Sequence, residues 1–459
     1  MTNRLYLTTA LPYVNAAPHL GHALELVQAD VLARHHRLRG AEVRLFTGTD
    51  DNAAKNVTAA AAAGQPVAEF VAENAARFTA LAAPLDIAVD VHAATSSARH
   101  REVVQRLWRA CAADLYAGEY TGRYCPGCEA FVAESSCAEH GTTTEVSERN
   151  WFFRLSRYQD QIRDALESGR VRVLPEARRA EVLAFVHSGL ADFSASRPAA
   201  RSDGWGVPVP GDPDQVVYVW WDALTAYLDP RWWYDATRIH LVGKGILRFH
   251  AVHWLGLLLS AGEPLPDAVY VHDYVTVNGA KVSKSAGPSL DPLDLVTTYG
   301  VDALRWWVIR EVTPVGDTDF TTERLITRAD HELANGIGNL VARTLGLLDG
   351  YRPRTVENPL GLGDLPKTID DAVDRFDLRA AGGALVAAAE TANRFVAERQ
   401  PWRLAGAERA AVLDIAHSAC RLIGTELAPF LPSGAARIET ALDSVHTGHR
   451  PAPLFPRLR

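Results

Sequence analysis

The chain has 459 residues, of which 22% are charged and 47% hydrophobic, and its formal net charge at pH 7 is −8. This length exceeds one ordinary hydrophobic core, so two or three domains are expected. The negative charge excludes a protein coated in basic surface, and the absence of a long apolar run or a leader-like N-terminus predicts a soluble, cytoplasmic protein without membrane contact.

The first predicted elements are a strand and a helix. Residues 5–11, LYLTTAL, are apolar and partly β-branched, which is typical of a buried parallel strand. After Gly21 the apolar residues recur at helical spacing. A strand that enters a helix through a glycine-containing turn exposes backbone N–H groups to an anion, and His19 and His22 add side-chain donors. PHLGH therefore predicts a phosphate site; the alternative is a capped helix with solvent-facing histidines.

The chain then alternates between strand-like and helix-like segments up to about residue 115. VRLFTGTD is a predicted strand, and an alanine-rich helix is expected to run through Phe78. This alternation predicts the first half of a doubly wound parallel sheet. Residues 116–205 are predicted to be an insertion.

The insertion carries a pattern typical of a metal site. CPGC is followed after eight residues by CAEH, which gives three thiols and one imidazole at tetrahedral spacing. A redox CxxC is the competing interpretation, but it does not need the second pair. The prediction is a closed, structural Zn²⁺ site formed by Cys125, Cys128, Cys137 and His140. The other two cysteines, Cys111 and Cys420, are expected to be small buried hydrophobes.

The sheet is expected to resume in residues 206–324 with QVVYVWWDAL, IHLVGKGI and DAVYVHDYVTV. The next segment, VNGAKVSKSAG, contains two of only five lysines in the chain, Lys281 and Lys284. A lysine is a flexible point charge that can follow a phosphate as charge develops. A solvated surface loop is the alternative, but the scarcity of lysine favours a second phosphate-binding loop.

Amphipathic helical patterns continue from about residue 325, with the last helix ending near Leu442. Residues 325–459 hold 16 basic and 16 acidic side chains, so this predicted bundle has no polybasic tail. Any RNA contact there is expected to come from a local patch and from groups that read bases.

Seven segments together resemble the class I aminoacyl-tRNA synthetases, and most closely the methionyl-tRNA synthetase family. They include LPYVNAAPHLGHALELVQAD, YCPGCEAFV, YVWWDALTAY, VTVNGAKVSKS and ELANGIGNLVART, in that family's order. The resemblance implies a Rossmann-type doubly wound parallel sheet with a zinc-knuckle insertion and a C-terminal α-helical bundle. The implied bounds are 1–115 and 206–324 for the two halves of the catalytic domain, 116–205 for the insertion and 325–459 for an anticodon-binding-like bundle.

The resemblance also implies which residues bind the substrates. The amino-acid side chain would contact an apolar and aromatic set with two polar tips, namely Leu11, Tyr13, Trp220, Ala223, Tyr227, Ile246 and His250. Asp50 would hold the ammonium group of the amino acid. A tRNA anticodon would contact Asn339, Arg343 and Trp402, although each of these also fits a structural role, as a helix brace or a core side chain.

The implied reaction is the activation of an amino acid by ATP, with Mg²⁺ accompanying the nucleotide. The phosphates would contact His19, Gly21, His22, Lys281, Ser283, Lys284 and Ser285. Of these, His19, His22, Lys281 and Lys284 would carry the catalysis by stabilising charge in the transition state, without a covalent enzyme intermediate. The product would be an aminoacyl adenylate.

Three departures from the family pattern bear on the substrate. Where the family reads Gly-Thr-Asp-Glu-His-Gly, this chain continues from Asp50 with Asp51, Asn52 and Ala53. Gly245 replaces an aspartate expected beside the ribose, and Leu224 replaces a proline. Loss of one charged acceptor is expected to cost about 1.5–3 kcal/mol of binding, which suggests tuning toward another amino acid or acceptor.

The resemblance implies two alternative functions. The first is a monomeric methionine–tRNA ligase, in which the acceptor is a tRNA hydroxyl. The second is a small-molecule ligase that transfers the activated amino acid to a hydroxylamine or amine in hydrazine-type biosynthesis, with a cupin partner. The intact HLGH and KVSKS motifs serve both functions, and the anticodon-like residues favour the first.

Overall fold

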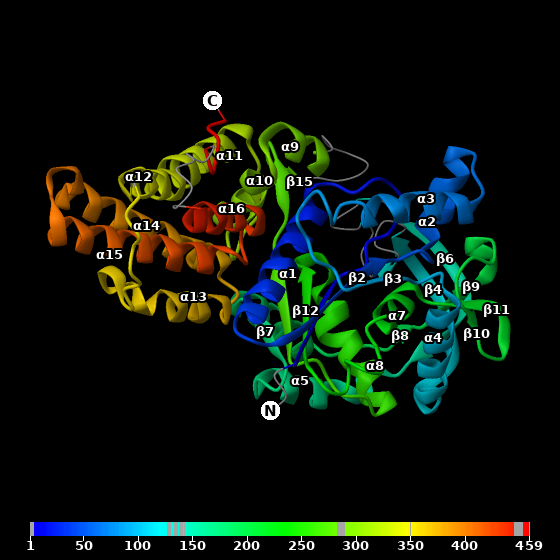
Figure 1. The fold of residues 1–459 in the computed structure, drawn as a ribbon. Helices are drawn as coiled ribbons and strands as arrows, with labels where there is room; N and C mark the ends of the chain where they lie inside the picture. The colour runs from blue at the N-terminus through cyan, green and yellow to red at the C-terminus, as the bar shows by residue number, and fades with distance from the viewer. Residues whose placement is uncertain are drawn as a thin grey trace. The chain divides into compact units, whose positions relative to one another are not determined.

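The computed structural model describes residues 4–125, 130–132, 136, 141, 143–281, 290–348, 350–444 and 453–458 (Figure 1). The chain forms two compact units. The first unit comprises residues 1–18, 41–82 and 89–272, and the second comprises residues 19–40, 83–88 and 273–459. No helix in the described ranges is long and apolar enough to cross a membrane.

A six-stranded parallel sheet forms the centre of the first unit. Its order is β3-β2-β1-β12-β13-β7, and every neighbouring pair is parallel. The strands are β1 (Arg4–Thr9), β2 (Glu42–Thr49), β3 (Val91–Ala94), β7 (Arg172–Leu174), β12 (Thr237–Gly243) and β13 (Ala268–His272). Because β1 pairs with β2 on one side and β12 on the other, the strand order changes direction at β1. The prediction of a parallel α/β sheet is confirmed.

The described residues of the first unit form seven α-helices. They are α2 (Ala54–Ala63), α3 (Val67–Thr79), α4 (Ala98–Ala110), α5 (Gln159–Glu167), α6 (Glu176–His187), α7 (Val219–Thr225) and α8 (Trp254–Ala261). The alanine-rich segment that was predicted as one helix is two helices, α2 and α3. Gly64 ends α2 in the left-handed conformation with φ +67°, and Pro66 precedes α3, so the helix cannot continue between them.

Antiparallel strands lie between the two halves of the parallel sheet in sequence. One sheet has the order β5-β4-β6-β8, formed by β4 (Leu115–Cys125), β5 (Ala130–Val132), β6 (Thr144–Phe153) and β8 (Phe193–Ser194). The other has the order β10-β11-β9, formed by β9 (Ser196–Pro198), β10 (Pro208–Val209) and β11 (Asp212–Val217). Within this part of the chain, β7 returns to the parallel sheet beside β13.

The prediction that QVVYVWWDAL continues the parallel sheet is wrong. Its first residues end β11, which pairs antiparallel with β9 and β10, and the segment then turns into α7 after Tyr218. A short apolar run has the same pattern in a buried strand of either kind and in a buried helix, so periodicity does not identify its partner.

The second unit is mainly helical and begins with α1 (Leu20–Leu38). A small sheet of order β15-β14-β16 follows, with β14 (Val275–Val277), β15 (Ala280–Lys281) and β16 (Thr318–Asp319). The helices are α9 (Pro292–Tyr299), α10 (Val301–Arg310), α11 (Thr322–Arg328), α12 (Asn339–Leu348), α13 (Leu365–Val373), α14 (Leu378–Arg399), α15 (Gly406–Leu427) and α16 (Pro432–Asp443). The helices α12 to α15 lie side by side, which confirms the predicted helical C-terminal region (Figure 1).

A buried ion pair fixes α1 within the second unit. The guanidinium of Arg305 donates to Asp30 at 2.8 Å, and both side chains are fully buried. The same guanidinium donates to the carbonyls of Leu85 and Phe430, at 2.9 and 2.8 Å. Removing Asp30 would leave the Arg305 guanidinium as an uncompensated buried charge, which typically costs about 3–5 kcal/mol. This pair therefore holds the helix that begins at the HLGH motif.

Candidate active site

The carboxyl ends of β1 and β2 bring two predicted substrate residues together. Tyr13 and Asp50 form an isolated parallel bridge, and the Asp50 N–H donates to the Pro12 carbonyl at 2.9 Å. The Asp50 side chain is buried, with 2% of its surface exposed. A carboxylate held at the ends of adjacent parallel strands lies where ligands bind in open α/β sheets.

Tyr227 and His250 form the polar tips that the sequence predicts. The His250 Nδ1 lies 3.0 Å from the Ile246 carbonyl, which only accepts, so Nδ1 carries the proton. Its Nε2 is therefore an acceptor and lies 3.0 Å from the Tyr227 hydroxyl, whose one proton also has the Thr9 carbonyl as an acceptor at 3.2 Å. Burial lowers the pKa of His250 to about 4, so the imidazole is neutral at physiological pH. The pair therefore presents a neutral, oriented polar group.

An aromatic stack connects these two groups of residues. Trp220, at the start of α7, stacks on Phe249 with ring centroids 3.9 Å apart and an interplanar angle of 5°. The Trp220 ring also meets Tyr13 edge-on at 6.2 Å, and Phe249 precedes His250 in the chain. Phe249 was missed in the sequence analysis, although its place beside His250 in LRFHAVHW is a signal. The stack joins the side of the site near Asp50 to the Tyr227–His250 pair.

The remaining predicted substrate residues lie nearby in the chain. Leu11 follows β1 and is half-buried, and Ala223 is buried in α7, one turn after Trp220. The Lys55 ammonium lies over the Tyr13 ring, 4.7 Å from its centroid. An apolar and aromatic wall with a few polar groups is the composition expected for a site that binds a small apolar side chain.

We expect stability to fall as the pH decreases from about 6.5 to about 4, because the His250 pKa is lowered to about 4 by burial. In this window the unfolded chain binds a proton at this histidine and the folded chain does not. The stabilisation is fully present above pH 6.5, and its loss amounts to about 3 kcal/mol for this group. Urea unfolding of a His250→Asn variant should show a flatter decline, whereas His187→Asn, which removes an exposed histidine, should keep the wild-type decline. Identical slopes for all three proteins would contradict the assignment.

The altered loop after Asp50 forms its own polar network. The Asn52 amide donates to Asp222 at 2.7 Å and to the Thr95 carbonyl at 2.9 Å. The other carboxylate oxygen of Asp222 lies 2.5 Å from His100 Nε2. Asp222 and His100 were missed in the sequence analysis because no local pattern links them to Asn52. The Asn52 amide group therefore has two partners within the first unit.

Asp51 and Leu224 are also accommodated inside the first unit. The Ser96 hydroxyl donates to Asp51 at 2.6 Å, and burial raises the pKa of this carboxyl. Leu224 is buried in the hydrophobic core with Trp221 and Tyr227. Gly245 lies in the short helical turn Lys244–Ile246 that follows β12.

The HLGH motif forms the start of α1 in the second unit. His19 is the N-cap residue, and its Nδ1 accepts from the Gly21 N–H at 3.1 Å, while the His22 Nδ1 accepts from the His19 N–H at 3.1 Å. The Leu20 N–H donates to the Leu290 carbonyl at 3.1 Å. The expectation that these backbone N–H groups face an anion is therefore wrong, because the histidine rings and Leu290 already accept from them.

This capping arrangement determines which ring nitrogen of each histidine can donate a hydrogen bond. Because both Nδ1 atoms accept, each neutral ring carries its proton on Nε2, which makes Nε2 the donor. The two rings lie 3.9 Å apart. A Cβ at Gly21 would lie 2.9 Å from the His19 ring, so glycine permits this packing. The phosphate contacts predicted for His19 and His22 can come only from the side chains.

The described residues that flank the KVSKS segment belong to the same unit as the HLGH motif. Lys281 ends β15, and Ser283, Lys284 and Ser285 lie outside the described residues. The chain is described again from Leu290, whose carbonyl accepts from Leu20 at the start of α1. The two motifs that the sequence separates by about 260 residues thus belong to one unit.

Only one predicted zinc ligand lies in the described part of the chain. Cys125 ends β4 and is fully buried, whereas Cys128, Cys137 and His140 lie outside the described residues. Within the described ranges no group of three metal-binding side chains occurs. Cys111 and Cys420 are both fully buried, as predicted, and this burial raises the pKa of each thiol to about 12.

The predicted anticodon residues lie on the helical part of the second unit. Trp402 is 51% exposed, so its predicted alternative as a core side chain is wrong. The Arg343 guanidinium lies over the Trp402 ring, 5.8 Å from the centroid. Asn339 begins α12 and donates to Asn393 at 3.5 Å. An exposed indole with an adjacent guanidinium can stack on a base.

Comparison with known proteins identifies the family. The family described as class I tRNA synthetases (M) matches residues 5–139 and 132–345. The methionine–tRNA ligase of Brucella suis is 37% identical over 470 residues, covering 95% of this chain and 91% of that protein. The chain belongs to the methionyl-tRNA synthetase family. The corresponding ligase of Thermosynechococcus vestitus is 38% identical, with 94% of this chain and 88% of that protein covered.

Solved methionyl-tRNA synthetases share the whole fold. The Mycobacterium tuberculosis enzyme in complex with methionyl-adenylate has a TM-score of 0.91 and 34% sequence identity, and the match covers 100% of both chains. Its free form has a TM-score of 0.85, 32% identity and coverage of 100% of this chain and 98% of that chain. The Rossmann-like core and helical C-terminal region of the two units are therefore those of methionyl-tRNA synthetases.

Proposed function

We propose that this protein is a methionine–tRNA ligase, an ATP-dependent enzyme that forms AMP and pyrophosphate. The observation that carries this proposal is the alignment of 95% of the chain with proteins of that name at 37% identity, together with an oriented Tyr227–His250 pair beside a buried Asp50. The same comparisons favour this function over the predicted small-molecule ligase with a cupin partner. The substrates are methionine, ATP and tRNA.

The residues proposed to bind methionine lie in the first unit. Asp50 would hold the ammonium group of methionine, which leaves the substrate carboxylate available for attack. The thioether would lie against Trp220 and the Tyr227–His250 pair, with Leu11, Tyr13, Ala223 and Ile246 completing the apolar contacts. Because the His250 imidazole is neutral, it would offer the thioether a polar contact without placing a charge beside it. A thioether could not compensate such a charge.

The residues proposed to bind the ATP phosphates lie in the second unit. The Nε2–H groups of His19 and His22 would donate to ATP phosphates, with Gly21 leaving room for the His19 ring. The substrate carboxylate would attack the α-phosphorus, so that an O–P bond forms, the bond from the α-phosphorus to the bridging β-phosphate oxygen breaks, and pyrophosphate leaves. Lys281 and Lys284, with Ser283 and Ser285, would stabilise charge on the leaving pyrophosphate, and Mg²⁺ would accompany the nucleotide.

The other parts of the chain would bind the tRNA anticodon, form the catalytic domain and hold the structural metal. Residues 325–459 would bind the anticodon through Asn339, Arg343 and Trp402, and residues 1–115 and 206–324 would form the catalytic domain. Residues 116–205 would form the insertion that holds zinc. Three thiolates and one imidazole suit Zn²⁺, and the buried Cys125 is consistent with such a donor set. Since all four positions are filled by protein, the metal would stabilise the fold only.

Elemental analysis is expected to find about one zinc per chain, because a four-ligand site holds one ion. A Cys128→Ser variant should lose the metal and become susceptible to proteolysis within residues 116–205. Cys420→Ser changes a buried thiol far from these ligands in sequence, so it should retain the metal. A metal-free wild-type protein that resists proteolysis would contradict the zinc site.

The activation step is tested by pyrophosphate exchange into ATP, measured with each of the common amino acids in turn. Methionine is expected to support exchange with the highest kcat/KM, and exchange should not require tRNA. Preference for another amino acid would show that the altered residues Asp51, Asn52, Ala53, Leu224 and Gly245 have changed the substrate. The absence of exchange with every amino acid would contradict the proposed function.

A further inference from the structure

The hairpin β14–β15 carries the first lysine of the KVSKS loop. Thr276 pairs with Lys281 and Val277 with Ala280, and the turn between the two strands consists of Asn278 and Gly279. Both turn residues have positive φ, +53° and +74°. Two consecutive left-handed residues form the tight hairpin turn that Asn-Gly favours. The position of the Lys281 backbone therefore depends on this turn.

Asp319 holds the hairpin from the neighbouring strand. β16 pairs with β14 in parallel, with Thr276 opposite Asp319. One carboxylate oxygen of Asp319 accepts from the Gly279 N–H at 2.9 Å and from the Thr276 hydroxyl at 2.8 Å. These two hydrogen bonds, the Gly279 bond first, lower the pKa of Asp319. A single ionised side chain thus bridges the turn and the first strand of the hairpin.

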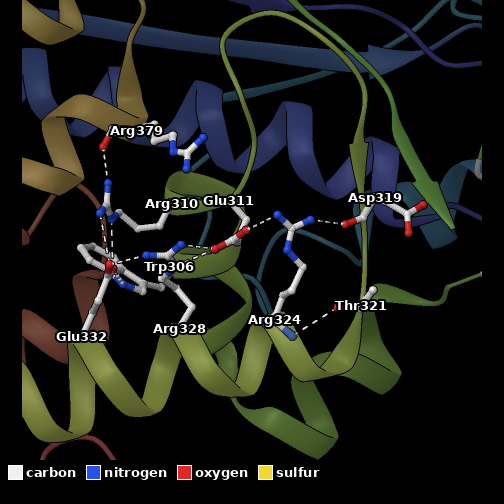
Figure 2. A network of polar contacts seen from close by, with 9 residues as sticks. All are labelled: Trp306, Arg310, Glu311, Asp319, Thr321, Arg324, Arg328, Glu332 and Arg379. Atoms are coloured by element: carbon white, nitrogen blue, oxygen red, sulfur yellow. Dashed lines mark hydrogen bonds and ion pairs between the residues drawn. The ribbon is translucent and has the colours of Figure 1, made fainter. Parts of the chain in front are cut away.

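Arg324 in turn fixes the backbone of Asp319. Its guanidinium donates to the Asp319 carbonyl at 3.3 Å and lies 3.2 Å from a carboxylate oxygen of Glu311 (Figure 2). The Glu311 carboxylate also accepts from Arg328 Nε at 2.7 Å. Arg324 therefore fixes the Asp319 backbone, while the Asp319 carboxylate fixes the hairpin.

The contacts continue to the helical part of the unit. Arg328 donates to Glu332 at 2.6 Å, and Glu332 also accepts from Arg310 at 3.0 Å. Arg310 donates to the Arg379 carbonyl at 2.6 Å, in α14 (Figure 2). Glu311 and Glu332 are buried and each pairs with two arginines, so loss of one arginine would leave a buried carboxylate with a single cationic partner. Because Arg328 pairs with both carboxylates, these ion pairs connect the residues that hold Asp319 to the helices of the second unit.

We propose that Asp319 is a positioning residue for the activation reaction, which acts by holding the hairpin that places Lys281. This inference rests on the proposed function, because the role of Lys281 does. The Asp319 carboxylate contacts the hairpin through Thr276 and Gly279, and it would act on the reaction through the position of Lys281. Misplacement of a charge-stabilising group by about 1 Å can cost about 10²-fold in rate, so a defect in this hairpin should appear in kcat.

Pyrophosphate exchange by Asp319→Ala is expected to show a kcat lower by about 10²-fold. The KM for methionine should be unchanged, since the contacts proposed for the amino acid lie in the first unit. Asp319→Asn retains an oxygen that can accept both hydrogen bonds, so it should recover most of the rate. Glu323→Ala, which removes an exposed carboxylate from the first turn of α11, is the matched control and should behave as wild type.

A double-mutant cycle distinguishes positioning from a general loss of stability. In a Lys281→Ala background, Asp319→Ala should reduce kcat further by less than about twofold, because residues that act through one another are not additive. An equal reduction in both backgrounds would overturn the proposal, since Asp319 would then act independently of Lys281.

Cleavage by a lysine-specific protease gives a readout that needs no activity. Asp319→Ala should release the fragment that ends at Lys281 several-fold faster than wild type, with cleavage after Lys367 unchanged. Normal cleavage and normal exchange by Asp319→Ala would overturn the inference while leaving the proposed function in place. Faster cleavage at Lys281 in a protein that exchanges with no amino acid would instead reject the proposed function, and with it the catalytic role of this support.

Discussion

A Lys284→Ala variant is expected to exchange pyrophosphate at least about 10²-fold more slowly than wild type, because charge stabilisation by one preorganised group is worth that much. Lys284 belongs to the KVSKS loop, which leaves β15 at Lys281 and returns at Leu290 beside the start of α1. The described residues on either side of this segment, Lys281 and Leu290, belong to the unit that carries the HLGH histidines. Removing the ammonium should slow the chemical step without unfolding the protein.

Lys367→Ala is the matched control for this experiment. Lys367 forms an exposed ion pair with Asp371 one turn away on α13, and such pairs contribute little. The control should exchange pyrophosphate at the wild-type rate. If Lys284→Ala also exchanged normally, the phosphate assignment of the KVSKS loop would be wrong.

Trp402→Ala is expected to reduce the charging of tRNA by roughly 5- to 150-fold, because stacking of an aromatic side chain on a base is worth about 1–3 kcal/mol. The indole is exposed and lies beside Arg343, so both can contact a base. Pyrophosphate exchange should be unchanged, since activation does not use the anticodon.

Tyr234→Ala removes another exposed aromatic side chain, in the first unit, and serves as the control. It should retain both exchange and charging. Normal charging by Trp402→Ala would reject Trp402 as an anticodon contact. A parallel loss of exchange and charging would mean that Trp402 supports the fold instead.

The parallel sheet was predictable because buried strands leave a strong local pattern. LYLTTAL and IHLVGKGI are apolar runs of strand length, and both lie at the centre of the sheet as β1 and β12. The break between α2 and α3 was not predicted, although Gly64 and Pro66 are local signals that a helix ends there. In contrast, β7 has only three residues and β11 pairs antiparallel, and neither fact is encoded in a short apolar pattern.

The candidate site was predictable only where residues match a family motif. Tyr13, Asp50, Tyr227 and His250 were assigned by resemblance, and the structure supplies contacts for each. The HLGH histidines were correctly placed at a helix start, but a sequence cannot show that their rings accept from the backbone N–H groups. The Asn52–Asp222 contact joins residues 170 positions apart, and such polar pairs have no periodic signal.

The most direct test is a charging assay with methionine, ATP and total tRNA, run beside pyrophosphate exchange on the same protein. Methionine should be attached to tRNA at a rate that depends on ATP, and methionine-dependent exchange should continue when tRNA is omitted. Exchange with methionine but no charging at any tRNA concentration would contradict a methionine–tRNA ligase and would point to a different acceptor.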